Sequence, residues 1–197
     1  MLHIMSIRNE EIGDLVLDAA RVCLLRGGGR KVTVSEVARQ AGVSRPTVYR
    51  RWPDIAEIIR DLLTREVLTI VEHVLGERGE PQDLDALADR VVTVVGALRD
   101  SDLISLLWRE QRDFMAPYVF ERLGTSQQGV LALLADMLAQ GQVRKQVRVG
   151  DAKRMASMVL LIAQSFLQSG ALVSDILAEG WSTELHDVIV GYLRPMP

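Results

Sequence analysis

Apolar residues recur along most of the chain at the three- and four-residue spacings of α-helices, and no run alternates for long as a strand would. A first helix is predicted from the apolar face formed by Ile12, Val16, Ala20 and Cys23. The glycines at 27–29 are expected to end it, because glycine tolerates the left-handed conformation of a helix stop. The pattern thus begins with one amphipathic helix.

The rest of the chain shows the same helical pattern. Two short helices are predicted at 34–41 and 45–51, and a long amphipathic helix is predicted at 54–75. Later helices are predicted at 83–99, 102–114, 117–123, 126–140, 151–178 and 183–193. The predicted fold class is all-α, with a three-helix head at 1–53 and an antiparallel helical body at 54–197.

Composition indicates a globular protein of the cytoplasm. Of 197 residues, 48% are hydrophobic, which is enough for a core, yet no segment approaches the roughly 18 uninterrupted apolar residues of a membrane span. Arg8, Glu10 and Glu11 stand where a signal peptide needs apolar residues, so secretion is not expected. The single cysteine, Cys23, fits a reducing compartment and is predicted to be a core residue.

Charge is unevenly distributed, which changes the meaning of the net charge of −3. Residues 1–60 contain 10 Lys/Arg and 7 Asp/Glu, whereas the remainder contains 13 and 19. Within 26–51 there are seven basic residues and one acidic residue, Glu36. A basic head on an acidic body is typical of a surface that binds phosphate, although charge alone is equally compatible with a solvated face.

The segment from Thr33 to Val43 has the local signals of two closely spaced helices. Thr33 and Glu36 match a capping box, in which the threonine oxygen accepts from a backbone N–H and the glutamate reaches back. Val37 is expected to lie in the core, Gly42 allows a tight turn, and Val43 is expected to pack beneath it. This pattern predicts a helix-turn-helix, although an ordinary helical hairpin remains the alternative.

The second of these helices is the predicted DNA-reading element. Ser44 caps it and Pro46 fits its first turn. If Val48 faces inward, the opposite side can meet base edges, with arginine to guanine and threonine or proline to a thymine methyl. Phosphate contacts are expected at the far end and at Thr33. The predicted DNA-binding residues are Thr33, Ser44, Arg45, Pro46, Thr47, Tyr49, Arg50 and Arg51.

This segment closely resembles the DNA-binding head of the tetracycline-repressor (TetR) family of bacterial regulators. The shared residues run from Val37 to Ser44 and from Thr47 to Trp52, and the resemblance covers about 9–63. It implies operator DNA, usually palindromic, as a partner. One departure is Ile55, which stands where many members have a phosphate-contacting lysine.

Metal, cofactor and catalytic sites are not expected. His3, His73 and His186 are scattered, and none has a second ligand at a spacing that metals use. The glycines at 27–29 lack a preceding strand and a P-loop pattern. No nucleophile and base form a constellation, so the chain is not predicted to be an enzyme.

Aromatic and methionine side chains in the body suit either an apolar ligand pocket or a plain helical core. The resemblance to the TetR family favours a pocket, because its members commonly bind small effectors there. The candidate ligand-binding residues are Leu106, Trp108, Phe114, Tyr118, Met137, Met158 and Phe166.

The last two predicted helices carry a broad stripe of small and apolar residues that includes Leu160, Ala163 and Ile189. Such a stripe can be interior packing or a subunit interface. The resemblance implies a homodimer in which these helices pair with their twins. The resulting interpretation is a dimeric repressor released by a small apolar or amphipathic ligand. The alternatives are a helical ligand-binding protein whose DNA role has lapsed and a small helical enzyme.

Overall fold

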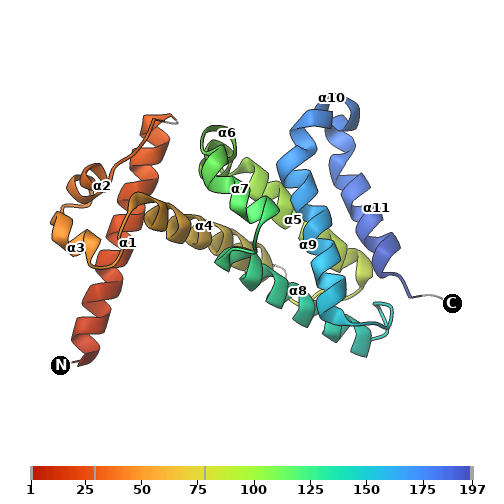
Figure 1. Cartoon of the computed structure of the whole chain (residues 1–197). Coiled ribbons are helices and arrows are strands. Elements are labelled where there is room, and N and C mark those ends of the chain that lie inside the picture. Colours follow the sequence, from red (N-terminus) through yellow and green to blue (C-terminus); the bar gives the residue numbers. More distant parts are fainter. Residues whose placement is uncertain (1, 29, 78, 196–197) are drawn as a thin grey trace. The chain divides into compact units, whose positions relative to one another are not determined.

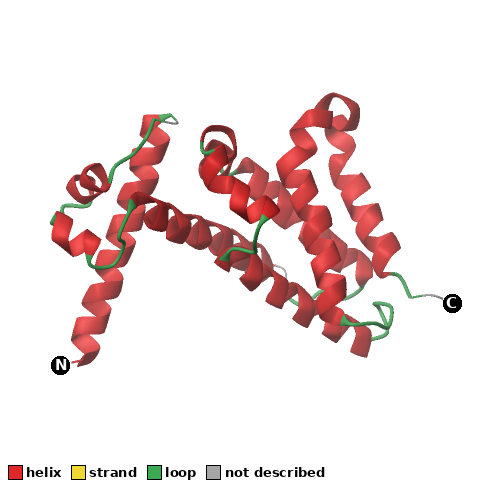
Figure 2. Ribbon diagram, viewed as in Figure 1, coloured by secondary structure: helices red, strands yellow, loops and turns green. Residues whose placement is uncertain are grey.

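The computed structural model describes residues 2–28, 30–77 and 79–195, with side chains from residue 11 onward. Gly29, part of the predicted helix stop, and the side chain of His3 lie outside this part. Every regular element among the described residues is a helix (Figure 2). The predicted all-α class is therefore confirmed.

The helices follow one another with short connections along the whole described chain (Figure 1). They are α1 (Leu2–Gly27), α2 (Val34–Gln40), α3 (Arg45–Tyr49), α4 (Ile55–Glu77), α5 (Leu84–Asp100), α6 (Asp102–Glu110), α7 (Arg112–Phe120), α8 (Thr125–Val143), α9 (Ala152–Ser169), η1 (Gly170–Val173), α10 (Ser174–Leu177), η2 (Ala178–Gly180) and α11 (Trp181–Leu193). Most predicted helices are found within a few residues of these bounds.

The chain divides into two compact units. Unit 1 comprises Met1–Glu66 and Asp102–Arg122, and unit 2 comprises Val67–Ser101 and Leu123–Pro197. Helix α4 contributes its first half to unit 1 and its second half to unit 2. The sequence predicts a different division, with a DNA-binding domain at 1–53 and a ligand-binding and dimerisation domain at 54–197. That functional boundary stays a prediction.

Unit 1 combines the head, defined as α1, α2 and α3, with the start of α4 and the α6–α7 pair. Helix α1 packs against α2 and α6, and its Val16 and Ala20 are fully buried. Val37, Val48 and Leu62 are equally buried on the other helices of the unit. This core fixes the orientation of the short helices, which are too short to be stable alone.

Helix α7 differs from its prediction. The sequence predicts a break before Pro117, because proline usually stands in a first turn. The structure breaks the chain at Gln111 instead and carries Pro117 inside α7. Packing overrides the local preference: Met115 is buried, and Arg60 Nε of α4 donates to the Tyr118 hydroxyl at 2.9 Å. Helix α7 is thereby held to α4 within unit 1.

Unit 2 is an antiparallel helical bundle built mainly from α5, α8, α9 and α11. Its core is continuous and wholly aliphatic at the most buried positions, including Leu138, Val159, Leu185, Ile189 and Leu193. Arg148 closes one end of the bundle, where its Nε donates to the Tyr192 carbonyl at 2.7 Å and its guanidinium stacks on the Tyr192 ring.

The long helix predicted at 151–178 is broken at Gly170, where the 3-10 segment η1 begins. The stretch Ala152–Leu193 contains an 18-residue window with a mean hydropathy of 1.6, and 28% of that window is buried. By length and composition alone, the stretch could cross a membrane. It folds as the separate helices α9, α10 and α11, of which α9 and α11 are neighbours and the short α10 lies in the connection between them (Figure 1, blue). Its apolar character is explained in part by the core of unit 2.

Candidate nucleic-acid interface

Helix α2 begins with the predicted capping box. Thr33 Oγ1 accepts from the Glu36 backbone N–H at 3.2 Å, and Glu36 Oε2 accepts from the Thr33 N–H at 2.9 Å. The Glu36 carboxylate also accepts from Arg30 Nη2 at 2.7 Å. The hydrogen bond from Arg30, followed by those from Thr33, lowers the pKa of Glu36 to about 2, so this side chain is ionised in neutral solution.

Thr33 is therefore less available to DNA than its sequence position indicates. Its hydroxyl donates to Glu36 Oε2 at 2.9 Å, and its backbone N–H donates to the same oxygen. A phosphate would have to displace the glutamate to use either donor. The predicted phosphate contact at Thr33 remains a prediction, and the observed role of this residue is to fix the start of α2.

The turn from α2 to α3 depends on one glycine. Gly42 has a φ of +68°, a conformation that other residues adopt only with strain, and the Val43 N–H then donates to the Ala38 carbonyl at 3.0 Å. Ser44 follows as the N-cap of α3, with Pro46 in the first turn of that helix. These local signals place α3 across α2 in a helix-turn-helix.

Helix α3 buries one side and exposes the other. Val48 is fully buried, whereas Arg45, Pro46 and Tyr49 are exposed. Thr47 is half-buried, and its hydroxyl lies 2.7 Å from Ser44 Oγ, so one of these two groups donates to the other. The structure thus places Arg45, Pro46 and Thr47, which are predicted to read base edges, together at the start of α3.

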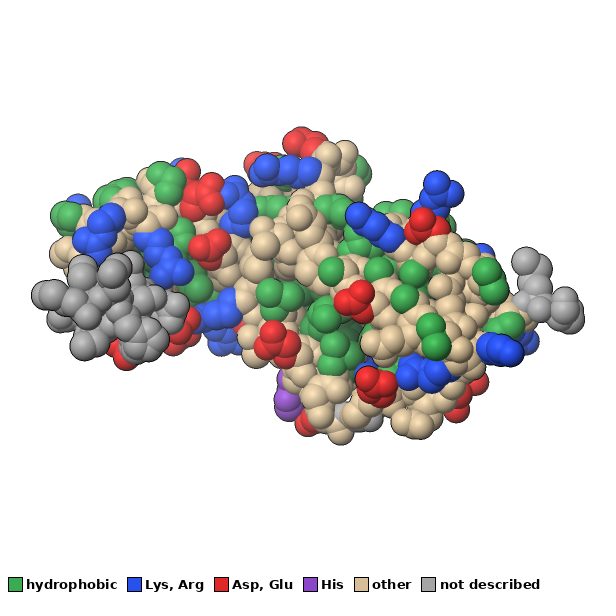
Figure 3. All heavy atoms as spheres, turned by 90° about the horizontal axis from the view of Figure 1, so that it is seen from below, with side chains coloured by type: hydrophobic (Ala, Val, Ile, Leu, Met, Phe, Trp, Pro, Cys, Tyr) green, Lys and Arg blue, Asp and Glu red, His purple; other side chains and the backbone are tan. Residues whose placement is uncertain are grey.

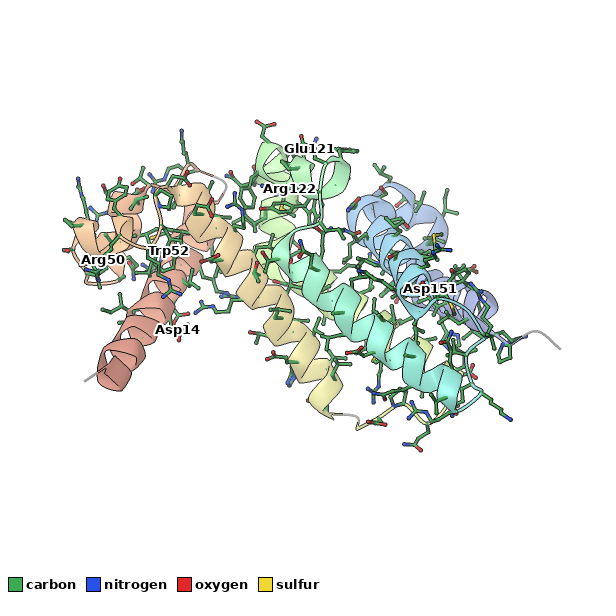
Figure 4. All side chains as sticks on the ribbon, turned by 60° about the horizontal axis from the view of Figure 1, so that its bottom comes forward. Asp14, Arg50, Trp52, Glu121, Arg122 and Asp151 are labelled. Carbon is green, nitrogen blue, oxygen red and sulfur yellow. The ribbon has the colours of Figure 1, made fainter. Side chains whose placement is uncertain are left out.

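Arg50 and Arg51, at the far end of α3, have different surroundings. Arg50 is exposed, at the outer side of the head, whereas Trp52 lies within it (Figure 4). Arg51 is also exposed, but its guanidinium stacks 4.7 Å from the centre of the Trp52 ring and lies against Gly13 of α1. Of these two arginines, both predicted to contact phosphate, Arg50 has no such stacking partner among the described residues.

Trp52 connects α3 to α4. It is 2% exposed, and its indole Nε1 donates to Asp61 Oδ2 at 2.7 Å. Asp54 caps α4 by accepting from the Glu57 N–H at 2.9 Å, as expected, and Ile55 is a half-buried first residue of that helix. Asp61 was not selected from the sequence, because it is nine residues from its partner and no local motif links the two.

The surface of the head is rich in basic side chains, some of which are visible in Figure 3. A short helix that presents an arginine, a proline and a tyrosine on one face, flanked by further arginines, has the chemistry to contact base edges and phosphate oxygens. The geometry defines a helix-turn-helix DNA-binding class of protein.

The comparisons with known proteins agree with this class. Residues 16–62 match the family described as "Bacterial regulatory proteins, tetR family". The chain is 42% identical over 190 residues to an uncharacterised HTH-type transcriptional regulator of Mycobacterium tuberculosis, covering 96% of this chain and 98% of that protein. The chain therefore belongs to the TetR family of bacterial transcriptional regulators, a family without enzymatic activity.

Two solved structures share the fold at low sequence identity. The transcriptional repressor QsdR of Rhodococcus erythropolis has a TM-score of 0.70 at 15% identity, with 93% of this chain and 95% of that chain covered. FadR of Bacillus subtilis in complex with stearoyl-CoA has a TM-score of 0.64 at 16% identity, with 91% and 98% covered. These likenesses confirm a TetR-like arrangement of an N-terminal head and a helical body.

The candidate ligand residues fall into both units. Leu106, Trp108, Phe114 and Tyr118 belong to unit 1, where Leu106 is buried and the three aromatic residues are half-buried. The remaining three belong to unit 2: Met137 and Phe166 pack partly against its core, and Met158 is exposed. Their assignment to an effector stays a prediction.

Proposed function

We propose that this protein is a homodimeric, cytoplasmic transcriptional repressor that binds palindromic operator DNA through α3. The observation that carries the proposal is the division of α3, with Val48 fully buried and Arg45, Pro46 and Tyr49 exposed. Arg45 can bridge guanine O6 and N7, and Pro46 or Thr47 can contact a thymine methyl. Phosphate contacts from Arg50 and its neighbours supply most of the affinity.

The dimer is proposed to form through the exposed side of α9 and α11. Met158 and Leu161 stand one helical turn apart on α9 and are 44% and 57% exposed, and Val188 on α11 is 45% exposed. Leu160 and Ala163, which the sequence left open as interface positions, are instead buried in the core of unit 2. Large apolar side chains left outside the core favour a partner surface, and twofold pairing suits a palindromic operator.

A small apolar or amphipathic ligand is proposed to release the DNA. Support comes from the half-buried aromatic side chains of α6 and α7, where the Phe114 and Tyr118 rings lie 5.7 Å apart. Further support is the shared fold of FadR, which was solved with stearoyl-CoA. A ligand that prefers one conformation must weaken DNA binding by the same factor by which DNA weakens ligand binding.

The hydrogen bond between Arg60 and Tyr118 gives the ligand a physical route to the head. Tyr118 is one of the candidate ligand residues, and Arg60 lies on α4 beside Glu57, with which it also forms an ion pair. A ligand that moves the Tyr118 ring changes the contact that α7 makes with α4. Because α4 follows α3 shortly after Trp52, a displacement of Tyr118 reaches the recognition helix in two steps. The first is the hydrogen bond from Arg60 of α4 to Tyr118, and the second is the short connection from α4 back to α3.

Selection of bound duplexes from a random DNA pool tests the proposal. Full-length protein should enrich a palindromic site with salt-dependent affinity, and Arg45→Ala should relax one position of that site at a cost of about 1–3 kcal/mol. Arg50→Ala is the matched control, because it should weaken operator and random duplexes alike. Failure to enrich any sequence would refute operator recognition and leave a helical ligand-binding protein as the alternative.

A further inference from the structure

A groove on the surface of the head is lined mostly by residues that have not been assigned to DNA so far. It has a volume of about 230 Å³ and runs between α2 and the start of α3. Its lining residues are Ser35, Glu36, Ala38, Arg39, Val43 and Arg45. Only Arg45 among these was selected from the sequence as a DNA contact.

The one acidic side chain of the groove is already engaged. Glu36 Oε1 accepts from Arg30 Nη2 at 2.7 Å, and Glu36 Oε2 accepts both donors of Thr33 at 2.9 Å. Its charge is therefore paired with Arg30, and both of its oxygens already accept hydrogen bonds. The carboxylate does not compete for the other cations of the groove.

The two arginines of the groove are exposed and uncommitted. Neither Arg39 nor Arg45 forms an ion pair with any residue that the structure describes, and the Ser35 hydroxyl likewise makes no hydrogen bond there. Two guanidinium groups beside one neutralised carboxylate give the groove a positive potential. A guanidinium fork matches the oxygens of a phosphate and binds them through two parallel hydrogen bonds.

We propose that this groove binds one phosphate of the operator backbone, with Arg39 and Ser35 as its ligands and Arg45 adding positive potential at the rim. The inference rests on the proposed function, because it takes the phosphate from duplex DNA. It fits the general docking of a helix-turn-helix, in which the first helix crosses the backbone while the second enters the major groove. Helix α2 then contributes affinity, and α3 contributes sequence choice.

The test measures binding of full-length protein to a selected operator and to a random duplex by fluorescence anisotropy across a series of salt concentrations. Arg39→Ala should weaken both duplexes by about tenfold and lower the slope of log affinity against log salt by about 1. Arg39→Lys should restore the slope but less of the affinity, because lysine keeps the charge and loses the fork. Ser35→Ala should weaken both duplexes by a smaller factor with an unchanged slope.

Arg122→Ala is the matched control, since it removes the same charge from an exposed position that follows α7 and lies outside the head and the proposed dimer interface. An Arg39→Ala protein that melts normally and binds both duplexes with wild-type affinity and slope would overturn the groove assignment while leaving the proposed function intact. Inorganic phosphate that binds wild-type protein but not Arg39→Ala, without any change in DNA binding, would assign the groove to a free phosphate instead. Failure of wild-type protein to bind any duplex would overturn both.

Discussion

Two adjacent leucines on α9 separate the core of unit 2 from the proposed dimer interface. Leu160 is 8% exposed and belongs to the core, whereas Leu161 is 57% exposed. Glutamate at the two positions should therefore have different consequences, one for the dimer and the other for the fold. Leu161→Glu should leave the fold of the monomer within about 0.5 kcal/mol of wild type and disrupt the dimer, whereas Leu160→Glu should unfold unit 2.

The magnitudes follow from the burial of each side chain. Fully burying a leucine contributes about 1.5–3 kcal/mol, so the exposed share of Leu161 represents about 1–2 kcal/mol for each protomer. A carboxylate placed without a partner in a dry interface adds several kcal/mol more. The dimer dissociation constant should therefore rise by at least about a hundredfold. At Leu160 even alanine costs about 2–5 kcal/mol, and a buried carboxylate costs more.

Sedimentation velocity across a range of concentrations measures the dimer, and thermal melting followed by circular dichroism measures the fold. The expected pattern is a folded monomer for Leu161→Glu and an unfolded or strongly destabilised chain for Leu160→Glu. A Leu161→Glu protein that melts like wild type and sediments as a dimer with an unchanged dissociation constant would place the interface elsewhere and refute the reasoning from exposure.

Three further predictions concern the head. Trp52→Phe should destabilise unit 1 by about 1–3 kcal/mol, because it removes the hydrogen bond to the Asp61 carboxylate. A double-mutant cycle with Asp61→Asn in chemical denaturation should show coupling between the two residues, and a coupling energy of zero would count against this bond. Gly13→Ala should displace the Arg51 guanidinium, because the new Cβ would clash with Arg51 Nη1, yet it should change stability little, because alanine favours the helix by about 1 kcal/mol. A loss of more than about 2 kcal/mol in chemical denaturation would show that Arg51 cannot move. The folded-state pKa of Glu36 is lowered from 4.5 to about 2, so its stabilising effect should be complete above pH 4.5 and vanish as the pH falls towards 2. The difference in melting temperature between wild type and Glu36→Gln should therefore shrink over that range, and a constant difference would contradict the ionised capping box.

The parts of the head that follow from the sequence are those set by contacts within a few residues. The capping box of Thr33 and Glu36, the Ser44 cap and the turn at Gly42 each depend on neighbours no more than five residues away. Such contacts leave a pattern in the sequence itself. The helix-turn-helix and its family could therefore be predicted before any tertiary packing was known.

The rest depends on contacts between distant parts of the chain. The pairing of Trp52 with Asp61 and of Arg60 with Tyr118 has no local signature, and the latter helps to hold Pro117 inside a helix where the sequence predicts a break. Helical periodicity identified an apolar stripe on α9, but it could not show which side the core of unit 2 covers. Only packing distinguishes Leu160 from Leu161.

The same limit applies to the predicted effector residues. The sequence groups them by their aromatic and methionine character, and chemistry alone gives no sign that Trp108 and Phe166 belong to different compact units. Arg39 was overlooked for a related reason, because a single exposed arginine on a short helix has no distinctive pattern. Its significance comes from the groove that it shares with Ser35 and Arg45.

The three tryptophans of the chain are distributed so that each reports on a different packing environment. Trp52 lies in the head against a carboxylate, Trp108 is half-buried on α6, and Trp181 stacks under the Arg99 guanidinium in unit 2. Indole emission depends on the polarity and charge of its surroundings. Replacing two of these residues with phenylalanine would leave a single tryptophan whose emission reports on one region. Variants that replace Trp52 would also carry the destabilisation expected from the loss of its bond to Asp61, so they would be compared with Trp52→Phe alone.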